Sequence, residues 1–423
     1  MSNPRTIQKI AFFFLVVLIL ALIFTEANAQ RTLSIGCSLT YIGGGTSGRS
    51  VSDGVLDYLN WMASHGGIEY KDPVSGKKEK VALKITWEDN AWDITKAITV
   101  YKRLKARGVN MIFGIGSGPG EACAATASRD KLPYLCAYGT ASPAGYKPKP
   151  QYYFCFQPTI GEVETPPIKW FIKQKWQGNR PPRIGILCTD LPSWRVIGKP
   201  GQMDSYVKSV GGELAGIEFI PVLITDMSVQ LTRLVVEKKA DCIFLIGVLT
   251  QTVVMAKDLQ RMGIDTKKTT VMCAQPAWDE SLLKSIPGEM EGLYGQSQVI
   301  SSEEDVPGMR KVKEVAKWAR RTPEEIVFNY TNGFAGAWLL EGMIKEALEK
   351  KGFQEVAKSG EIMRDVMSSY KPADLGGLVQ SWGVKHQDYP YFINSSLMFE
   401  VKGGKFRKVG GWETVDRIPG AID

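Results

Sequence analysis

The alternation of short apolar runs with amphipathic helical stretches constrains the fold of this 423-residue chain more than any other feature. In the first part of the chain, strand-like and helix-like segments alternate at residues 33–39, 53–63, 81–87, 93–106, 110–116, 120–129 and 133–138. Strands that are separated by helices pair in parallel, so this order predicts a doubly wound parallel sheet.

The same alternation restarts in the middle of the chain, with strand-like runs at 183–188, 216–222, 242–248 and 271–274. Two α/β units in tandem are therefore predicted. Further on, Thr322-Pro323-Glu324-Glu325 has the pattern of a capping box with proline at the first helical position. It predicts a long helix that ends at Gly352 and packs on the first unit, whose sheet needs helices on both faces.

The N-terminus has the pattern of a secretory signal. Arg5 and Lys9 precede an unbroken apolar run at 10–24, and Ala27-Asn28-Ala29 offers small residues for cleavage. We expect a cleaved signal peptide at residues 1–29. An uncleaved membrane anchor is the alternative, but the run is shorter than the roughly 20 apolar residues that a spanning helix needs.

Composition argues against several classes of function. The net charge of +8 is spread along the chain without a basic block, so we expect no nucleic-acid partner. With only His65 and His386 and no CxxC, the chain offers no metal-ligand cluster and we expect no metal and no cofactor. It also contains neither a GxSxG elbow nor a Walker loop, which disfavours an enzyme.

The stretch MIFGIGSGPGEACAATA at 111–127 superficially resembles a phosphate-binding loop. Pro119 and Glu121 occupy positions where a dinucleotide fingerprint needs glycine or alanine, and no lysine follows. What remains is a strand-to-helix turn with open backbone N–H groups and the Ser117 hydroxyl, which suits an anion such as a carboxylate. Plain turn chemistry is the alternative explanation.

Several short motifs, taken in order, resemble the type I periplasmic binding proteins of the leucine/isoleucine/valine-binding group, which serve ABC importers of the branched-chain amino acid class. Besides the Ser117 loop, the matching motifs include His65-Gly66-Gly67-Ile68, Leu132-Pro133-Tyr134 and Glu291-Gly292-Leu293-Tyr294-Gly295. The resemblance implies an α/β protein of two Rossmann-like lobes with parallel sheets, joined by three hinge crossovers, with a ligand cleft between them. It places lobe one at 30–156 plus 297–392 and lobe two at 157–296 plus 393–423.

Ligands of open parallel sheets bind beyond the carboxyl ends of the strands. In the family, the loops that match Ser117 and 138–142 hold the carboxylate and part of the ammonium of the ligand. Aromatic residues at the strand ends suit an apolar or planar ligand, although packing at a sheet edge explains each of them equally well. The predicted ligand-binding residues are Tyr41, Trp92, Ser117, Gly118, Tyr138, Gly139, Thr140, Asp190, Trp194 and Gln275.

Gln275 departs from the family pattern. It matches the position where amino acid binders of the family place an acidic residue that pairs with the ligand ammonium. Glutamine offers hydrogen bonds without a charge, so an ammonium would lose its counter-ion in a closed cleft. Unless Asp190 or Asp279 substitutes, this predicts an organic acid or amide, aromatic ones included, as the ligand.

The resemblance thus implies a monomeric periplasmic protein that captures a small solute by hinge closure and delivers it to the membrane permease of an ABC importer. The alternative is a periplasmic ligand sensor that docks on a separate signalling receptor.

Overall fold

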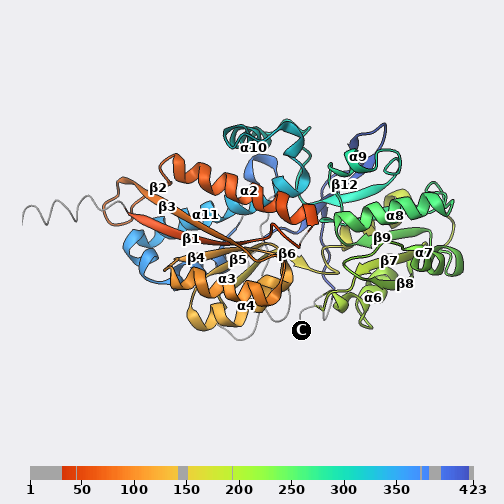
Figure 1. Cartoon of the computed structure of the whole chain (residues 1–423), viewed down its shortest axis with the longest axis horizontal. Helices are drawn as coiled ribbons and strands as arrows, with labels where there is room; N and C mark the ends of the chain where they lie inside the picture. The colour runs from red at the N-terminus through yellow and green to blue at the C-terminus, as the bar shows by residue number, and fades with distance from the viewer. Residues whose placement is uncertain are drawn as a thin grey trace, which may run out of the picture.

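The structure is a computed structural model that describes residues 31–43, 45–141, 151–192, 194–371, 374–380 and 392–418, except the side chains of residues 45, 46 and 138–141. The predicted signal peptide at 1–29 lies outside these residues. Within the described part, no helix is long and apolar enough to cross a membrane. Two α/β lobes lie along the longest axis of the molecule (Figure 1).

Lobe one is built on a six-stranded sheet in the order β2-β3-β1-β4-β5-β6. The strands β3, β1, β4, β5 and β6 pair in parallel, as the alternation of segments predicts, whereas β2 pairs antiparallel with β3. The sequence did not indicate β2 and β6. The strands are β1 (Thr32–Leu39), β2 (Ile68–Lys71), β3 (Lys78–Asp89), β4 (Met111–Ile115), β5 (Tyr134–Ala141) and β6 (Tyr153–Thr159).

Helices cover both faces of this sheet (Figure 1). Helices α3 and α4 share one buried cluster with the sheet, and α2 and α11 belong to another. The helices of this lobe are α2 (Gly45–Ser64), α3 (Ile94–Ala106), α4 (Ser117–Asp130), α10 (Pro307–Trp318), α11 (Phe328–Lys358) and α12 (Gly360–Ser369). The long C-terminal helix α11 therefore packs on the first unit, as predicted.

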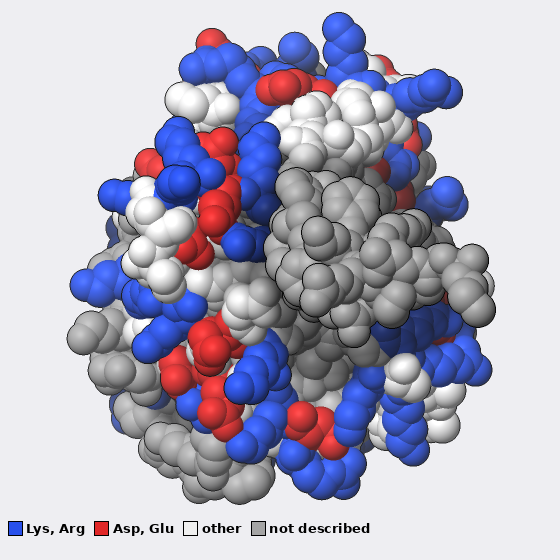
Figure 2. Space-filling model, turned by 90° about the vertical axis from the view of Figure 1, so that its left-hand side faces the viewer, with Lys and Arg blue, Asp and Glu red and all other residues white. Residues whose placement is uncertain are grey.

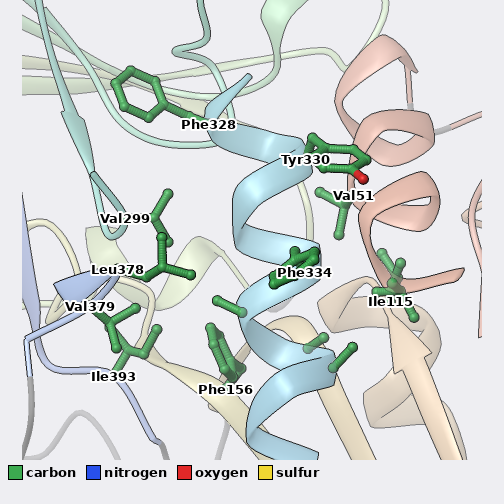
Figure 3. Close-up of a cluster of buried hydrophobic side chains, with 14 of the residues drawn as sticks. Val51, Ile115, Phe156, Val299, Phe328, Tyr330, Phe334, Leu378, Val379 and Ile393 are labelled. Carbon is green, nitrogen blue, oxygen red and sulfur yellow. The ribbon is translucent and has the colours of Figure 1, made fainter. Parts of the chain in front are cut away.

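Two glycines allow α2 and α11 to pack with their backbones in contact. A Cβ on Gly54 would lie 2.1 Å from the carbonyl oxygen of Tyr330, and one on Gly333 would lie 2.1 Å from that of Val51. Figure 3 shows α11 descending through the core, with its Tyr330 directed toward Val51 and with Phe156 and Ile393 on the opposite side of the helix. The helix is thus enclosed on several sides, which explains its almost continuous burial.

The start of α11 differs from the prediction. The Thr322–Glu325 capping box is present, but it closes only a 3₁₀ turn, η5 (Pro323–Glu325). Helix α11 begins at Phe328, whose backbone N–H donates to Oε2 of Glu280 at 2.7 Å. At the other end, Gly352 has a φ of 78° and interrupts the helix where a stop was predicted, after which the chain continues helically to Lys358.

Lobe two is built on an eight-stranded sheet, of which β7–β11 pair in parallel and β12–β14 pair antiparallel. The strands are β7 (Arg183–Thr189), β8 (Glu213–Ile220), β9 (Cys242–Ile246), β10 (Thr270–Cys273), β11 (Tyr294–Ser297), β12 (Ser395–Val401), β13 (Phe406–Lys408) and β14 (Glu413–Thr414). The α-helices are α5 (Thr165–Trp170), α6 (Met203–Ser209), α7 (Ser228–Leu231), α8 (Leu249–Arg261) and α9 (Leu282–Ser285). The remaining helical segments are η2 (Phe171–Lys175), η3 (Arg195–Gly198), η4 (Thr232–Glu237) and, outside this lobe, η6 (Leu375–Gly377).

Segments that leave one lobe for the other lie beside each other at the centre of the molecule. The backbone N–H groups of Phe392 and Ile393 both donate to the carbonyl oxygen of Phe156 at 3.0 Å. The Gln157 side chain, which follows Phe156, donates to the side chain of Gln298. The predicted two-lobed α/β fold is therefore confirmed, while the boundary residues assigned to each lobe stay a prediction.

The surface at the lobe-one end carries charges of both signs. Figure 2 shows Lys and Arg side chains interspersed with Asp and Glu side chains over this face. Charged side chains of lobe one also form ion pairs. Examples are Lys105 with Asp130 at 2.8 Å and Arg107 with Glu88 at 2.8 Å. Many basic side chains of this lobe therefore have an acidic neighbour, and the described charges form no single-sign patch there.

Candidate functional site

A cavity of about 50 Å³ lies between the lobes, and both lobes line it. Its walls are mainly apolar, with a few polar side chains. From the lobe-one side, the lining includes Thr40, Ser47, Gly48, Trp92, Gly116 and Ser117. From the lobe-two side, the lining includes Ile160, Val163, Glu164, Trp194, Val248 and Gln275.

Most of the lining residues follow the carboxyl end of a strand. Trp92 follows β3, Ser117 follows β4, Trp194 follows β7 and Gln275 follows β10. This is the position that the general rule for open parallel sheets gives to ligands. The structure therefore brings together four of the predicted site residues around one cavity, and their contact with a solute stays a prediction.

Asn90 holds the lobe-one wall together. Its side chain is fully buried, and its Nδ2 donates to the carbonyl oxygens of Ser38 and Ile115, each at 3.2 Å. Its Oδ1 accepts from the Thr40 hydroxyl and from the backbone N–H of Trp92, both at 2.8 Å. One amide thus ties the ends of β1, β3 and β4 into a single rigid wall.

The backbone places Trp92 at the cavity by an uncommon turn. Ala91 and Trp92 both have left-handed φ angles, 53° and 54°. Asp89 Oδ1 accepts from the N–H of Ala91 at 2.8 Å, which supports this strained geometry. The indole then lies against Gly116, where a Cβ would be 3.1 Å from Trp92 Cδ1, so glycine is needed there for close packing as well as for its φ of 95°.

Ser117 is the first residue of α4, and Gly116 precedes it as a cap without a side-chain hydrogen bond. The first turn of α4 contains no acidic residue. Pro119 has no N–H and Gly120 donates to the carbonyl oxygen of Gly116, so the N–H groups of Ser117 and Gly118 and the positive end of the helix dipole favour an anion next to the Ser117 hydroxyl.

The lobe-two wall presents polar groups of a different kind. Gln275 is 7% exposed; its Oε1 accepts from the backbone N–H of Gln298 at 3.0 Å. Its Nε2 has no hydrogen-bond partner among the described residues, and neither does Nε1 of the buried Trp194. Two buried N–H donors therefore remain for a bound solute.

Glu164 also belongs to this wall and is not one of the predicted site residues. It is 1% exposed, and its Oε2 accepts from Nε2 of Gln296 at 3.0 Å. Its Oε1 has no partner among the described residues. Burial raises the pKa of this carboxyl group to about 8, and the Gln296 hydrogen bond lowers it less.

The other predicted site residues lie elsewhere or cannot be placed. Tyr41 packs on Trp87 with ring centroids 5.2 Å apart and donates to Asp53, which keeps its ring away from the described cavity lining. Asp190 forms a two-point ion pair with Arg195 on the surface, and this pairing lowers the pKa of Asp190.

Gly118 lines a separate, more open hollow of about 530 Å³ beside Trp92. The side chains of Tyr138 and Thr140 lie outside the described part of the structure, although the backbone of Tyr138, Gly139 and Thr140 belongs to β5. Asp279, considered above as a substitute counter-ion, is buried against Asn329, whose Nδ2 donates to it at 2.8 Å. It is not among the described residues of the cavity wall.

Comparison with known proteins identifies the family. The sequence pattern of the family described as "Periplasmic binding protein" matches residues 34–405. The chain belongs to the periplasmic binding protein family. The type I periplasmic binding protein inferred from the sequence motifs is thereby confirmed. Among curated protein sequences, none matches this chain.

Solved structures share the fold of this periplasmic binding protein at low sequence identity. A branched-chain amino acid ABC transporter protein from Thermus thermophilus with bound valine matches with a TM-score of 0.75 and 16% identity, over 91% of this chain and 97% of that one. A solute-binding protein from R. palustris in complex with 4-hydroxybenzoate matches with a TM-score of 0.72 and 17% identity, over 92% and 99%. A fatty acid ABC transporter substrate-binding protein from Thermomonospora curvata matches with a TM-score of 0.71 and 17% identity, over 91% and 92%.

Proposed function

We propose that this protein is the exported, monomeric solute-binding component of an ABC importer, and that it captures a small organic acid or amide without converting it chemically. The observation that carries the proposal is the cavity between the lobes. It has mainly apolar walls, the N-terminus of α4 on one side and the uncharged Gln275 on the other.

The two walls suit the two parts of such a solute. A carboxylate fits beside Ser117, because α4 presents open N–H groups there. The indoles of Trp92 and Trp194 suit an apolar or planar body. The similar fold of a protein bound to 4-hydroxybenzoate supports an aromatic acid as a candidate solute. The similar fold of a protein bound to valine is the reason to test amino acids beside it.

Capture by hinge closure follows from the position of the cavity. A solute that contacts both lobes binds the closed form more tightly than the open form, so it shifts the population toward closure. The segments around Phe156, Gln298 and Ile393 provide the hinge, because they pass between the lobes and are hydrogen-bonded to one another. The closed form then docks on the permease and releases the solute.

Thermal-shift measurements followed by calorimetry test the solute class. The panel is benzoate, 4-hydroxybenzoate, short aliphatic amides, leucine and valine. We expect stabilisation by an acid or an amide, by about 3 kcal/mol at a concentration 100 times the Kd. Stabilisation by leucine or valine, and by no acid or amide, would contradict the proposal.

Two variants and one scattering experiment sharpen this test. S117A removes a hydroxyl donor at the carboxylate corner, so it should weaken every acid about five- to tenfold. D190N is the matched control, because Asp190 pairs with Arg195 away from the described cavity wall. The D190N variant should bind acids with the wild-type affinity. In solution scattering, the radius of gyration should decrease when a binding solute is added, and an unchanged value would rule out closure.

A further inference from the structure

Three buried polar atoms on the lobe-two wall have no partner among the described residues. They are Oε1 of Glu164, Nε2 of Gln275 and Nε1 of Trp194. All three residues line the same cavity, and each is less than 10% exposed. A buried polar atom without a hydrogen bond destabilises the solute-free protein, so a bound solute gains affinity by supplying the missing partner.

Hydrogen bonds behind the wall determine which oxygen of Glu164 carries a proton when the carboxyl group is neutral. The Ser396 hydroxyl donates to Oε1 of Gln296 at 3.1 Å, which orients the Gln296 amide. Nε2 of Gln296 then donates to Oε2 of Glu164 at 3.0 Å. Because Oε2 already accepts a hydrogen bond, the proton belongs on Oε1, which is the oxygen without a protein partner.

The surroundings of Glu164 favour this neutral form. Among the described residues that line the cavity, none carries a basic side chain. An ionised carboxylate without a counter-charge is costly in a dry interior, and burial accordingly raises the pKa of Glu164 to about 8. The Cys188 thiol lies near enough to interact electrostatically with Glu164; burial raises the pKa of Cys188, so this thiol stays neutral as well.

We propose that Glu164 is a specificity-determining residue that acts as a neutral O–H donor and, together with the N–H groups of Gln275 and Trp194, binds an oxygen atom of the solute. This inference rests on the proposed function, since it assumes that the cavity holds the solute. It adds to that function the kind of solute group, a hydrogen-bond acceptor, that the lobe-two wall binds.

A wall with three hydrogen-bond donors favours a solute whose polar group accepts hydrogen bonds. A carboxylate, carbonyl or hydroxyl oxygen on the solute accepts from such a wall. An ammonium group only donates, so it leaves all three donors without partners and loses its own hydration in addition. The wall therefore rejects a solute whose second polar group is an amine.

Three related probes test this selection by calorimetry at neutral pH: 4-hydroxybenzoate, benzoate and 4-(aminomethyl)benzoate. Their distal groups are a hydroxyl oxygen, a hydrogen atom and an ammonium. With the carboxylate bound at Ser117, we expect 4-hydroxybenzoate to bind about tenfold more tightly than benzoate, and 4-(aminomethyl)benzoate to bind most weakly. Preference for the ammonium probe would overturn the inference.

Two substitutions at Glu164 test whether its carboxyl group acts as a neutral hydrogen-bond donor or as an ionised acceptor. E164Q keeps an N–H donor toward the cavity and an oxygen toward Gln296, so 4-hydroxybenzoate affinity should stay within about threefold of the wild-type value. E164M removes the donor and should lower it about tenfold, with little change for benzoate. A loss of binding in E164Q as large as in E164M, with both variants folded by circular dichroism, would overturn the inference.

A measurement without solute keeps this test separate from that of the proposed function. Infrared difference spectra of wild type and E164Q should show the C=O stretch of one protonated carboxyl group at neutral pH, present only in the wild type. Absence of that band would refute a neutral Glu164 whatever the solute. If the band is present, the neutral carboxyl group of Glu164 is confirmed. If none of the three probes binds in that case, the proposal of an aromatic acid fails, and the expected order of affinity among the probes is refuted.

Discussion

The replacement of Glu164 by glutamine is expected to change how the stability of the solute-free protein depends on pH. In the folded wild type, the pKa of this carboxyl group is about 8, compared with 4.5 for an exposed glutamate. Below about pH 4.5, the group is protonated in both the folded and the unfolded chain and contributes no difference. Above that pH, the unfolded chain releases the proton while the folded chain retains it.

The sign and the size of the effect follow from linkage. Because the folded state holds the additional proton, the free energy of unfolding falls as pH rises from about 4.5 to about 8, and then levels off. At about 1.4 kcal/mol for each pKa unit, the shift corresponds to a loss of about 5 kcal/mol over this interval. In E164Q this contribution disappears, because an amide does not titrate in this range.

Thermal unfolding of both proteins in a series of buffers measures the difference. We expect the Tm of E164Q minus that of wild type to increase from acid to mildly alkaline pH by about 10 °C, at about 2 °C for each kcal/mol. Other buried acids with raised pKa values, such as Glu280, are present in both proteins and cancel. Parallel Tm curves for the two proteins would show that Glu164 is ionised in the folded state and would refute the reasoning.

Two further predictions concern the lobe-one framework. G54A should destabilise the protein by about 3 kcal/mol in thermal unfolding, because its Cβ would lie 2.1 Å from the carbonyl oxygen of Tyr330. G288A is its control and should have little effect, since a Cβ there meets nothing within 4 Å; equal Tm values for both variants would contradict the close packing of α2 on α11. N90A should lower the free energy of unfolding by about 3 kcal/mol, because several hydrogen bonds are lost. It should also weaken solute binding measured by calorimetry. An unchanged Tm would show that Asn90 does not organise the wall.

The fold was largely predictable because strands such as β1, β4 and β9 are mostly buried apolar runs, each followed by a helix. Residues 153–159 were missed because the sequence shows no helical pattern between them and the strand predicted at 133–138, so the alternation of strands and helices gave no signal there. The start of α11 was placed too early because the Thr322 capping box ends a single turn, and the contact of Phe328 with Glu280 depends on the assembled lobes.

The site was predictable only where it follows the strand-end rule. Trp92, Ser117, Trp194 and Gln275 all stand at strand ends and were identified for that reason. Glu164 lies in the crossover after β6, two residues beyond another buried acid, Glu162. The tertiary structure pairs Glu162 with Arg417 at 2.9 Å and leaves Glu164 at the cavity, and nothing local in the sequence distinguishes the two glutamates.

The two walls of the cavity differ in how freely they can be redesigned. The lobe-one wall depends on Asn90, whose amide joins three strand ends, so substitutions there change stability and the shape of the wall together. On the lobe-two wall, Glu164, Trp194 and Gln275 each direct at least one polar atom that no described residue requires. Substitutions of similar size at Glu164 and Gln275 therefore explore new solute specificities, whereas Trp194 packs in the buried core of lobe two and is best retained. Lobe two is the natural starting point for converting this protein into a biosensor for other acids.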